Sequence, residues 1–160
     1  MEGLLNSVKG LSRLLNVIAG ISLAFIMGLT VLDVILRFFR MPIVGTFELV
    51  AFSGAVVIGF AIPYTSWVRG QIYVDFFVQR FSRVGQSIFN ISTRLMGIVL
   101  FFLAGWNLFK VGMDLQKSGE VSLTLQLPFY LVAYGIGVAC FIQCLVLLCD
   151  ILKIFGGKYE

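Results

Sequence analysis

The ionisable residues of this chain are few, and the most suggestive group surrounds the first turn between its apolar segments. Asp33 and Arg37 are four residues apart, the spacing at which opposite charges pair along one face of a helix. Glu48 follows across the turn and is expected to join them in a small ionic cluster. Two roles remain open: the cluster fixes the turn, or Arg37 and Glu48 contact a partner protein.

Three further charged residues are candidates for structural or partner contacts. Arg69 and Asp75 lie in the connection after the second apolar segment and are predicted to fix the elbow between two helices. Arg94 lies within the third apolar segment, and a charge at the bilayer centre costs about 2.5–3.5 kcal/mol on insertion scales. Because Arg94 is near one end of its segment, its long stem could snorkel to the surface. The alternative is a buried contact with a carboxylate of this chain or of a partner.

Residue types needed for common enzyme chemistry are missing. The chain has no histidine, which removes histidine ligation of haem or zinc and histidine general-base catalysis. No phosphate-binding loop of the Gly-x-x-x-x-Gly-Lys type occurs. Cys140, Cys144 and Cys149 lie in one apolar segment without a Cys-x-x-Cys motif and are expected to be buried free thiols. We therefore predict no catalytic residue, no cofactor, no metal site and no enzyme activity.

Four long apolar segments must position the charged residues. They cover residues 14–32, 49–68, 87–109 and 121–149. About 20 apolar residues in a helix cross the roughly 30 Å hydrocarbon core of a bilayer, and backbone amides in lipid must be paired within helices or a closed barrel. Continuous rather than alternating apolar runs exclude the barrel. The predicted fold class is all-α, an integral membrane bundle of four transmembrane helices with short interfacial helices.

The whole chain, residues 1–160, is predicted to be a single membrane domain. Its spans are expected at about 14–36, 47–68, 87–110 and 125–150. Hydrophobic residues make up 59% of the sequence, above the roughly 45–50% of soluble domains. The net charge of +4 is spread over the helix ends, so membrane lipids rather than nucleic acid are the predicted contacts.

Two segments outside the spans are expected to lie at the membrane surface. Residues 1–13 carry leucine and valine at helical spacing with polar residues between them, which predicts an amphipathic interfacial segment. The alternative is that residues 1–13 simply extend the first span. Residues 69–86 combine aromatic residues with arginines, which predicts a short interfacial helix.

Lysine and arginine in the connections predict the orientation, because they are enriched on the cytoplasmic side of membrane proteins. The two termini and the second connection share one side and carry Lys9, Arg13, Arg69, Arg80, Arg83, Lys153 and Lys158. The other side carries Arg37, Arg40, Lys110 and Lys117. We therefore predict a multi-pass protein with both termini in the cytoplasm.

A stripe of small residues marks the second span. Ala51, Ala55 and Gly59 follow one another at steps of four, and small residues allow a second helix to approach closely. We predict helix packing at this stripe, against the alternative that the spacing arises by chance. Pro63, one turn further on, is expected to kink the helix.

Three local patterns then occur in order along the chain. The first is Arg37, then Pro42-Ile43, then Glu48-Leu49, and the second is Arg69-Gly70-Gln71-Ile72-Tyr73-Val74-Asp75. The third is Leu123 to Tyr134, with Leu127-Pro128-Phe129 leading into the last span. Together with four spans in 160 residues, they resemble the small membrane subunit (DctQ type) of tripartite ATP-independent periplasmic (TRAP) transporters. Two departures are Gln71, where the family frequently has histidine, and Gly45-Thr46-Phe47, where many members have tryptophan and a second acidic residue.

The resemblance implies a function. In this family a large membrane permease subunit moves the substrate, typically an organic acid, with an ion gradient that is usually of sodium, and a periplasmic substrate-binding protein delivers it. The small subunit is expected to brace the large permease subunit and to aid docking of the binding protein, in a bacterial inner membrane. The partner contacts of Arg37 and Glu48 would then be with one of these two proteins.

Three other interpretations compete with this one. A small exporter working as a homodimer would need an essential carboxylate embedded in the first span, whereas Asp33 lies at the end of that span. A four-helix thiol oxidoreductase would need paired cysteines in its loops, whereas all three lie in the fourth apolar segment. A structural subunit of another membrane complex is opposed only by the order of the motifs.

Overall fold

The structure is a computed structural model, in which residues 2–68, 70 and 83–155 are described. It contains four long helices, α1 (Glu2–Phe38), α2 (Thr46–Trp67), α4 (Arg83–Ser118) and α5 (Phe129–Phe155). Each helix contains a stretch long and apolar enough to cross a membrane. The described part of the chain has no β-strand, so the predicted all-α fold with four transmembrane helices is confirmed. The predicted interfacial helix of the second connection, with Arg69 and Asp75, lies outside the described residues.

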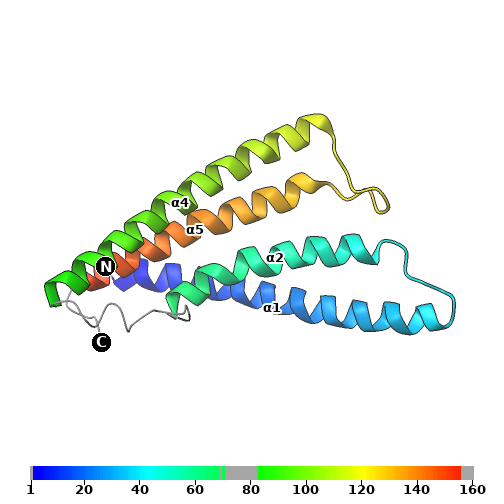
Figure 1. Ribbon diagram of the computed structural model, residues 1–160, viewed down its shortest axis with the longest axis horizontal. Coiled ribbons are helices and arrows are strands. Elements are labelled where there is room, and N and C mark those ends of the chain that lie inside the picture. Colours follow the sequence, from blue (N-terminus) through cyan, green and yellow to red (C-terminus); the bar gives the residue numbers. More distant parts are fainter. Residues whose placement is uncertain (1, 69, 71–82, 156–160) are drawn as a thin grey trace.

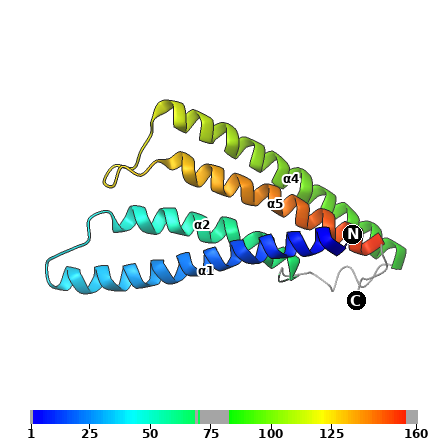
Figure 2. The ribbon, with the colours of Figure 1, turned by 180° about the vertical axis from the view of Figure 1, so that it is seen from behind.

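The four helices run alternately up and down and pack in the order α1, α2, α5, α4 (Figures 1 and 2). At one end, here called the convergent end, the start of α1, the end of α2, the start of α4 and the end of α5 come together (Figure 1). At the other, the turn end, lie the turns 39–45 and 119–128. The α1–α2 pair and the α4–α5 pair spread apart toward the turn end (Figure 2). Helix α5 lies inside this row, between α2 and α4. Helices α1 and α4 form the two edges of the row.

The amphipathic N-terminal segment belongs to the first helix, since α1 runs without a break over 37 residues. Val8 is buried against Val146 and Cys149 of α5, and Leu5 and Trp67 pack on the same cluster. One face of the segment therefore joins the bundle at the convergent end. Its position relative to a membrane surface stays a prediction.

The predicted small-residue stripe of α2 is used unevenly. Gly59 is buried, and a Cβ added there would lie 3.1 Å from the side chain of Ile136 on α5. Ala55 is half-buried and Ala51 is exposed. The close approach between α2 and α5 therefore occurs at Gly59, one turn before the buried Pro63.

The contact between α4 and α5 depends on glycines that follow a different spacing. A Cβ added to Gly97, Gly105 or Gly112 of α4 would lie 2.7–3.3 Å from a side chain of α5. On α5, a Cβ at Gly137 would lie 2.9 Å from the ring of Phe109. These glycines let the two helix backbones approach closely.

Candidate functional site

The first polar site lies around the turn that joins α1 to α2. The Asp33 carboxylate pairs with the Arg37 Nε at 2.8 Å and accepts a 3.0 Å hydrogen bond from the backbone amide of Ile43. Asp33 is buried, whereas the Arg37 side chain is 65% exposed. The pair has the i, i+4 geometry expected from the sequence. Through Ile43, the same carboxylate ties the turn back onto α1.

Glu48 does not join this pair, and the expected three-membered cluster is wrong in that respect. Its carboxylate accepts hydrogen bonds from the Ser122 hydroxyl at 2.6 Å and from the backbone amides of Thr124 and Leu125 at 2.7 and 2.9 Å. No ion pair between Glu48 and Arg37 is present among the described residues. The physical reason is that the 119–128 turn offers amide donors to a carboxylate in the first turn of α2.

The two turns are also in direct van der Waals contact. Gly45 has a φ of 83°, in the left-handed region, and a Cβ added there would lie 2.5 Å from Leu125 Cγ. Ser122, which donates to Glu48, accepts in turn from the amide of Leu127 at 3.2 Å. We call Gly45, Glu48, Ser122, Thr124 and Leu125 the turn clasp, since they join the start of α2 to the segment before α5.

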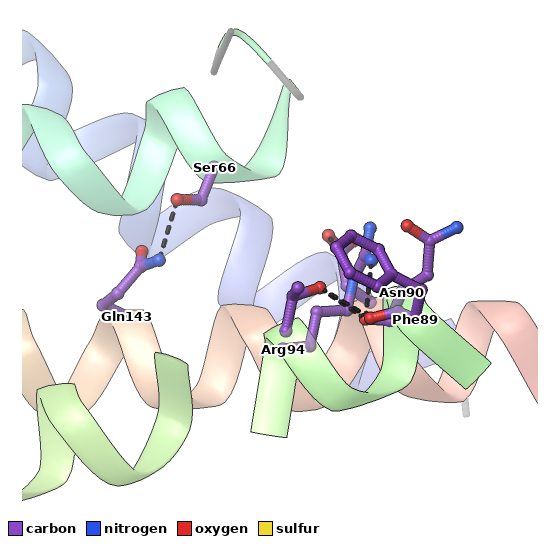
Figure 3. A network of polar contacts seen from close by, with 7 residues as sticks. Ser66, Phe89, Asn90, Arg94 and Gln143 are labelled. Atoms are coloured by element: carbon purple, nitrogen blue, oxygen red, sulfur yellow. Dashed lines mark hydrogen bonds and ion pairs between the residues drawn. The ribbon is translucent and has the colours of Figure 1, made fainter. Parts of the chain in front are cut away.

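The second polar site joins α4 to α5 near the convergent end. Arg94 Nε lies 3.7 Å from Asp150 Oδ2, and the two side chains are only 7% and 4% exposed. Arg94 Nη1 also donates to the carbonyl of Asn90 at 3.2 Å, and Figure 3 draws these two residues together. Of the two alternatives for Arg94, the structure contains the buried contact with a carboxylate of this chain. Nothing in the sequence spacing singled out Asp150 as that carboxylate, because 55 residues separate the two positions.

A third polar contact joins α2 to α5. The amide nitrogen of Gln143 donates to the Ser66 hydroxyl at 2.7 Å, and both side chains are buried (Figure 3). Sequence reasoning did not select these residues. The available signal was a lone glutamine within a long apolar run, since a buried amide needs a hydrogen-bond partner.

These contacts are of a structural kind. The described residues contain no group of three or more histidine, cysteine, aspartate or glutamate side chains that could hold a metal ion. Cys140, Cys144 and Cys149 lie in α5 as thiols rather than as disulfides. The carboxylates of Asp33, Glu48 and Asp150 each contact another part of this chain, so each holds elements together.

The fold and the site define a multi-pass membrane protein whose polar side chains connect its own helices. The family model described as "Tripartite ATP-independent periplasmic transporters, DctQ component" matches residues 26–157. The chain therefore belongs to this family, the small permease component of TRAP transporters, which confirms the resemblance found in the sequence. DctQ is a transporter component rather than an enzyme family, and in TRAP systems it implies association with a large permease and a binding protein. No curated protein and no solved structure matches the chain.

Proposed function

We propose that this chain is the accessory subunit that braces the large permease subunit of a sodium-coupled TRAP transporter for organic acids. It would extend the fixed part of the transporter and would not itself bind the substrate. Family membership supports the transporter assignment. The bracing role rests on the arrangement of the helices.

The observation that carries the proposal is the open row of four helices. The edge helices have large apolar side chains that this chain does not cover: Ile21, Met27 and Val34 on α1, and Met96 and Leu100 on α4. Within a membrane such faces meet lipid or another membrane protein. Two edges of this kind suit a subunit that lies beside a larger one.

The polar contacts favour a scaffold over a carrier. A carrier working alone usually places ionisable groups and broken helices at the bilayer midplane. Here the Arg94 charge lies in the first third of α4 and is buried against Asp150, and Gly59 of α2 packs on the apolar side chain of Ile136. These features support a helper of transport rather than a path for solute.

We further propose that the protein lies in the bacterial inner membrane with both termini in the cytoplasm. The turn end, with the turn clasp, would then face the periplasm, the side from which a binding protein approaches. Arg37, exposed at this end, is proposed as a contact of the large subunit or of the binding protein. Arg69 and Asp75 are proposed to fix the cytoplasmic elbow, and replacing Asp75 with Asn should then reduce complex formation.

The experiment is a pull-down of the tagged chain from its native membrane in mild detergent, with mass spectrometry of the proteins that accompany it. A multi-span permease in stoichiometric amount supports the proposal, and deletion of this chain should then reduce organic-acid uptake. Purification of the chain alone as a homodimer would refute the proposal and favour the exporter. A stoichiometric partner with no loss of uptake on deletion would refute the bracing role only.

A further inference from the structure

The antiparallel contact between α4 and α5 keeps one register along the described part of both helices. As residue numbers rise along α4, the partners on α5 fall, as an unbroken antiparallel alignment requires. The contacts join Gly97 to Leu147, the carbonyl of Ile98 to the Cys144 sulfur at 3.6 Å, and Gly112 to Tyr134. Arg94 and Asp150 continue the same alignment toward the convergent end.

Most of this contact cannot select the register by itself. Apolar burial is non-directional and depends on the area removed from solvent. Lipid tails moreover compete with apolar side chains, because they are equally apolar. If α5 slid by one turn, about 5.4 Å, the close fits at Gly97, Gly105 and Gly112 would be lost, but leucine, valine and phenylalanine side chains would still face apolar partners.

The ion pair behaves differently. A slide of one turn in one direction would place Arg94 opposite Val146, and in the other would place Asp150 opposite Ile98. Either slide would separate two charges that are 3.7 Å apart and nearly inaccessible, and an uncompensated buried charge is strongly unfavourable. The native alignment is the one that keeps the charges together.

We propose that the Arg94–Asp150 pair is a register lock, meaning that it selects one antiparallel alignment of α4 on α5 from several that packing alone would permit. Buried polar residues fix the register of some coiled coils in the same way. The lock determines where the 119–128 turn meets α2, because α5 follows directly after that turn.

The test is disulfide cross-linking of the full chain in its membrane, in a background with Cys140→Ala and Cys149→Ala that leaves Cys144. Ile98→Cys reports the native alignment, since the backbone carbonyl of residue 98 contacts the Cys144 sulfur. Phe102→Cys, one turn further along α4, reports a slide of one turn. With the parent charges, Cys144 should form a disulfide with the new thiol of Ile98→Cys in high yield. It should form little disulfide with the new thiol of Phe102→Cys.

The double variant Arg94→Met with Asp150→Leu replaces both charges with neutral side chains of similar size. In this variant α5 should also populate alignments on α4 that are shifted by one turn. The ratio of the Phe102→Cys product to the Ile98→Cys product should then rise by about tenfold, which corresponds to about 1.4 kcal/mol of preference. The reversed pair, Arg94→Asp with Asp150→Arg, should restore the parent ratio. Arg37→Met is the matched control, because Arg37 pairs within one helix and its loss should leave the ratio unchanged.

An unchanged ratio in the neutral pair would show that packing alone sets the register and would overturn the proposal. If the neutral pair does not accumulate in the membrane, the reversed pair decides. Parent-like accumulation and ratio then support the register lock, whereas a raised ratio or a failure to accumulate refutes it. The readout needs no partner protein, so it is independent of the proposed bracing role.

Discussion

Replacing Gly45 with Ala should destabilise the protein at the turn clasp through two separable effects. The first is the backbone, since Gly45 has a φ of 83° and a residue with a side chain in the left-handed region costs about 1–2 kcal/mol. The second is contact, since the new Cβ would lie 2.5 Å from Leu125 Cγ. Overfilling a packed site costs about 1–3 kcal/mol. The two effects together predict a loss of about 2–5 kcal/mol in the free energy of unfolding.

A double-mutant cycle separates the two effects. In a Leu125→Ala background the contact with Cγ disappears, so Gly45→Ala should cost only the backbone part, about 1–2 kcal/mol. Gly45→Asn is the complementary variant, because asparagine tolerates left-handed backbone better than alanine does but still carries a Cβ. It should therefore retain mainly the contact cost.

The assay is titration of the purified protein in detergent micelles with sodium dodecyl sulfate, with unfolding followed by tryptophan fluorescence. Trp67 is a suitable reporter, because it packs on the cluster formed by Val8, Val146 and Cys149. Equal losses for Gly45→Ala in the parent and in the Leu125→Ala background would refute the contact argument. No loss in either background would refute the backbone argument as well.

Three further predictions concern the joints between helices. Glu48→Gln should speed proteolysis within the 119–128 turn, because the glutamine side-chain amide cannot accept all three of the hydrogen bonds that the carboxylate accepts. An unchanged cleavage rate would show that the turn is held by other contacts. Gly112→Ala should lower the free energy of unfolding by about 1–3 kcal/mol, because its Cβ would lie 2.7 Å from an aromatic ring of α5. The control Gly20→Ala places its Cβ where no atom lies within 4 Å and should raise the free energy of unfolding by about 0.5–1 kcal/mol. Equal effects of the two substitutions would contradict the packing described. Ser66→Ala should lower the free energy of unfolding by about 1–3 kcal/mol, because it leaves the buried Gln143 amide without its acceptor. The double variant Ser66→Ala with Gln143→Leu should recover most of that loss in the same titration. If it does not, the hydrogen bond is not the source of the effect.

The number and type of the helices could be predicted because lipid imposes them on any long apolar run. The boundaries were harder to predict, and α1 begins at Glu2, ahead of the first span expected at residue 14. Residues 2–13 are polar on one face, which in isolation suits a membrane surface. The structure packs Val8 of the apolar face onto Val146 of α5, a contact between the two ends of the chain that no local pattern encodes.

The polar contacts show the same limit of local reasoning. Asp33 and Arg37 could be paired from the sequence because one helix carries both. Glu48 was grouped with them because it is close in sequence, yet its partners begin 74 residues later, at Ser122. Asp150, at the end of the last expected span, could not be singled out from the sequence, because its pairing with Arg94 depends on how two helices align.

Small residues were recognised as helix-packing positions where they follow one another at steps of four. They were not recognised where they follow a longer step. The stripe on α2 was recognised from steps of four, and Gly59, the buried member of that stripe, makes a close contact with α5. The three glycines of α4 that face α5 side chains are seven or eight residues apart, at 97, 105 and 112, which is close to two helical turns. A search for glycines every two turns would have identified the α4–α5 contact.

The joints of the row explain how four thin helices could act as a brace. The turn between α1 and α2 is held by Asp33, α2 is joined to α5 through Ser66 and Gln143 and through the turn clasp, and α5 is joined to α4 by the Arg94–Asp150 pair. Each of these contacts is directional, whereas apolar packing in lipid permits sliding. The α2–α5 and α4–α5 pairs therefore each have a polar contact that opposes sliding, and Asp33 and the turn clasp hold the two turns at the turn end. A row held in this way can resist bending when a moving permease subunit pushes on one edge, and we propose that this stiffness is what the subunit supplies.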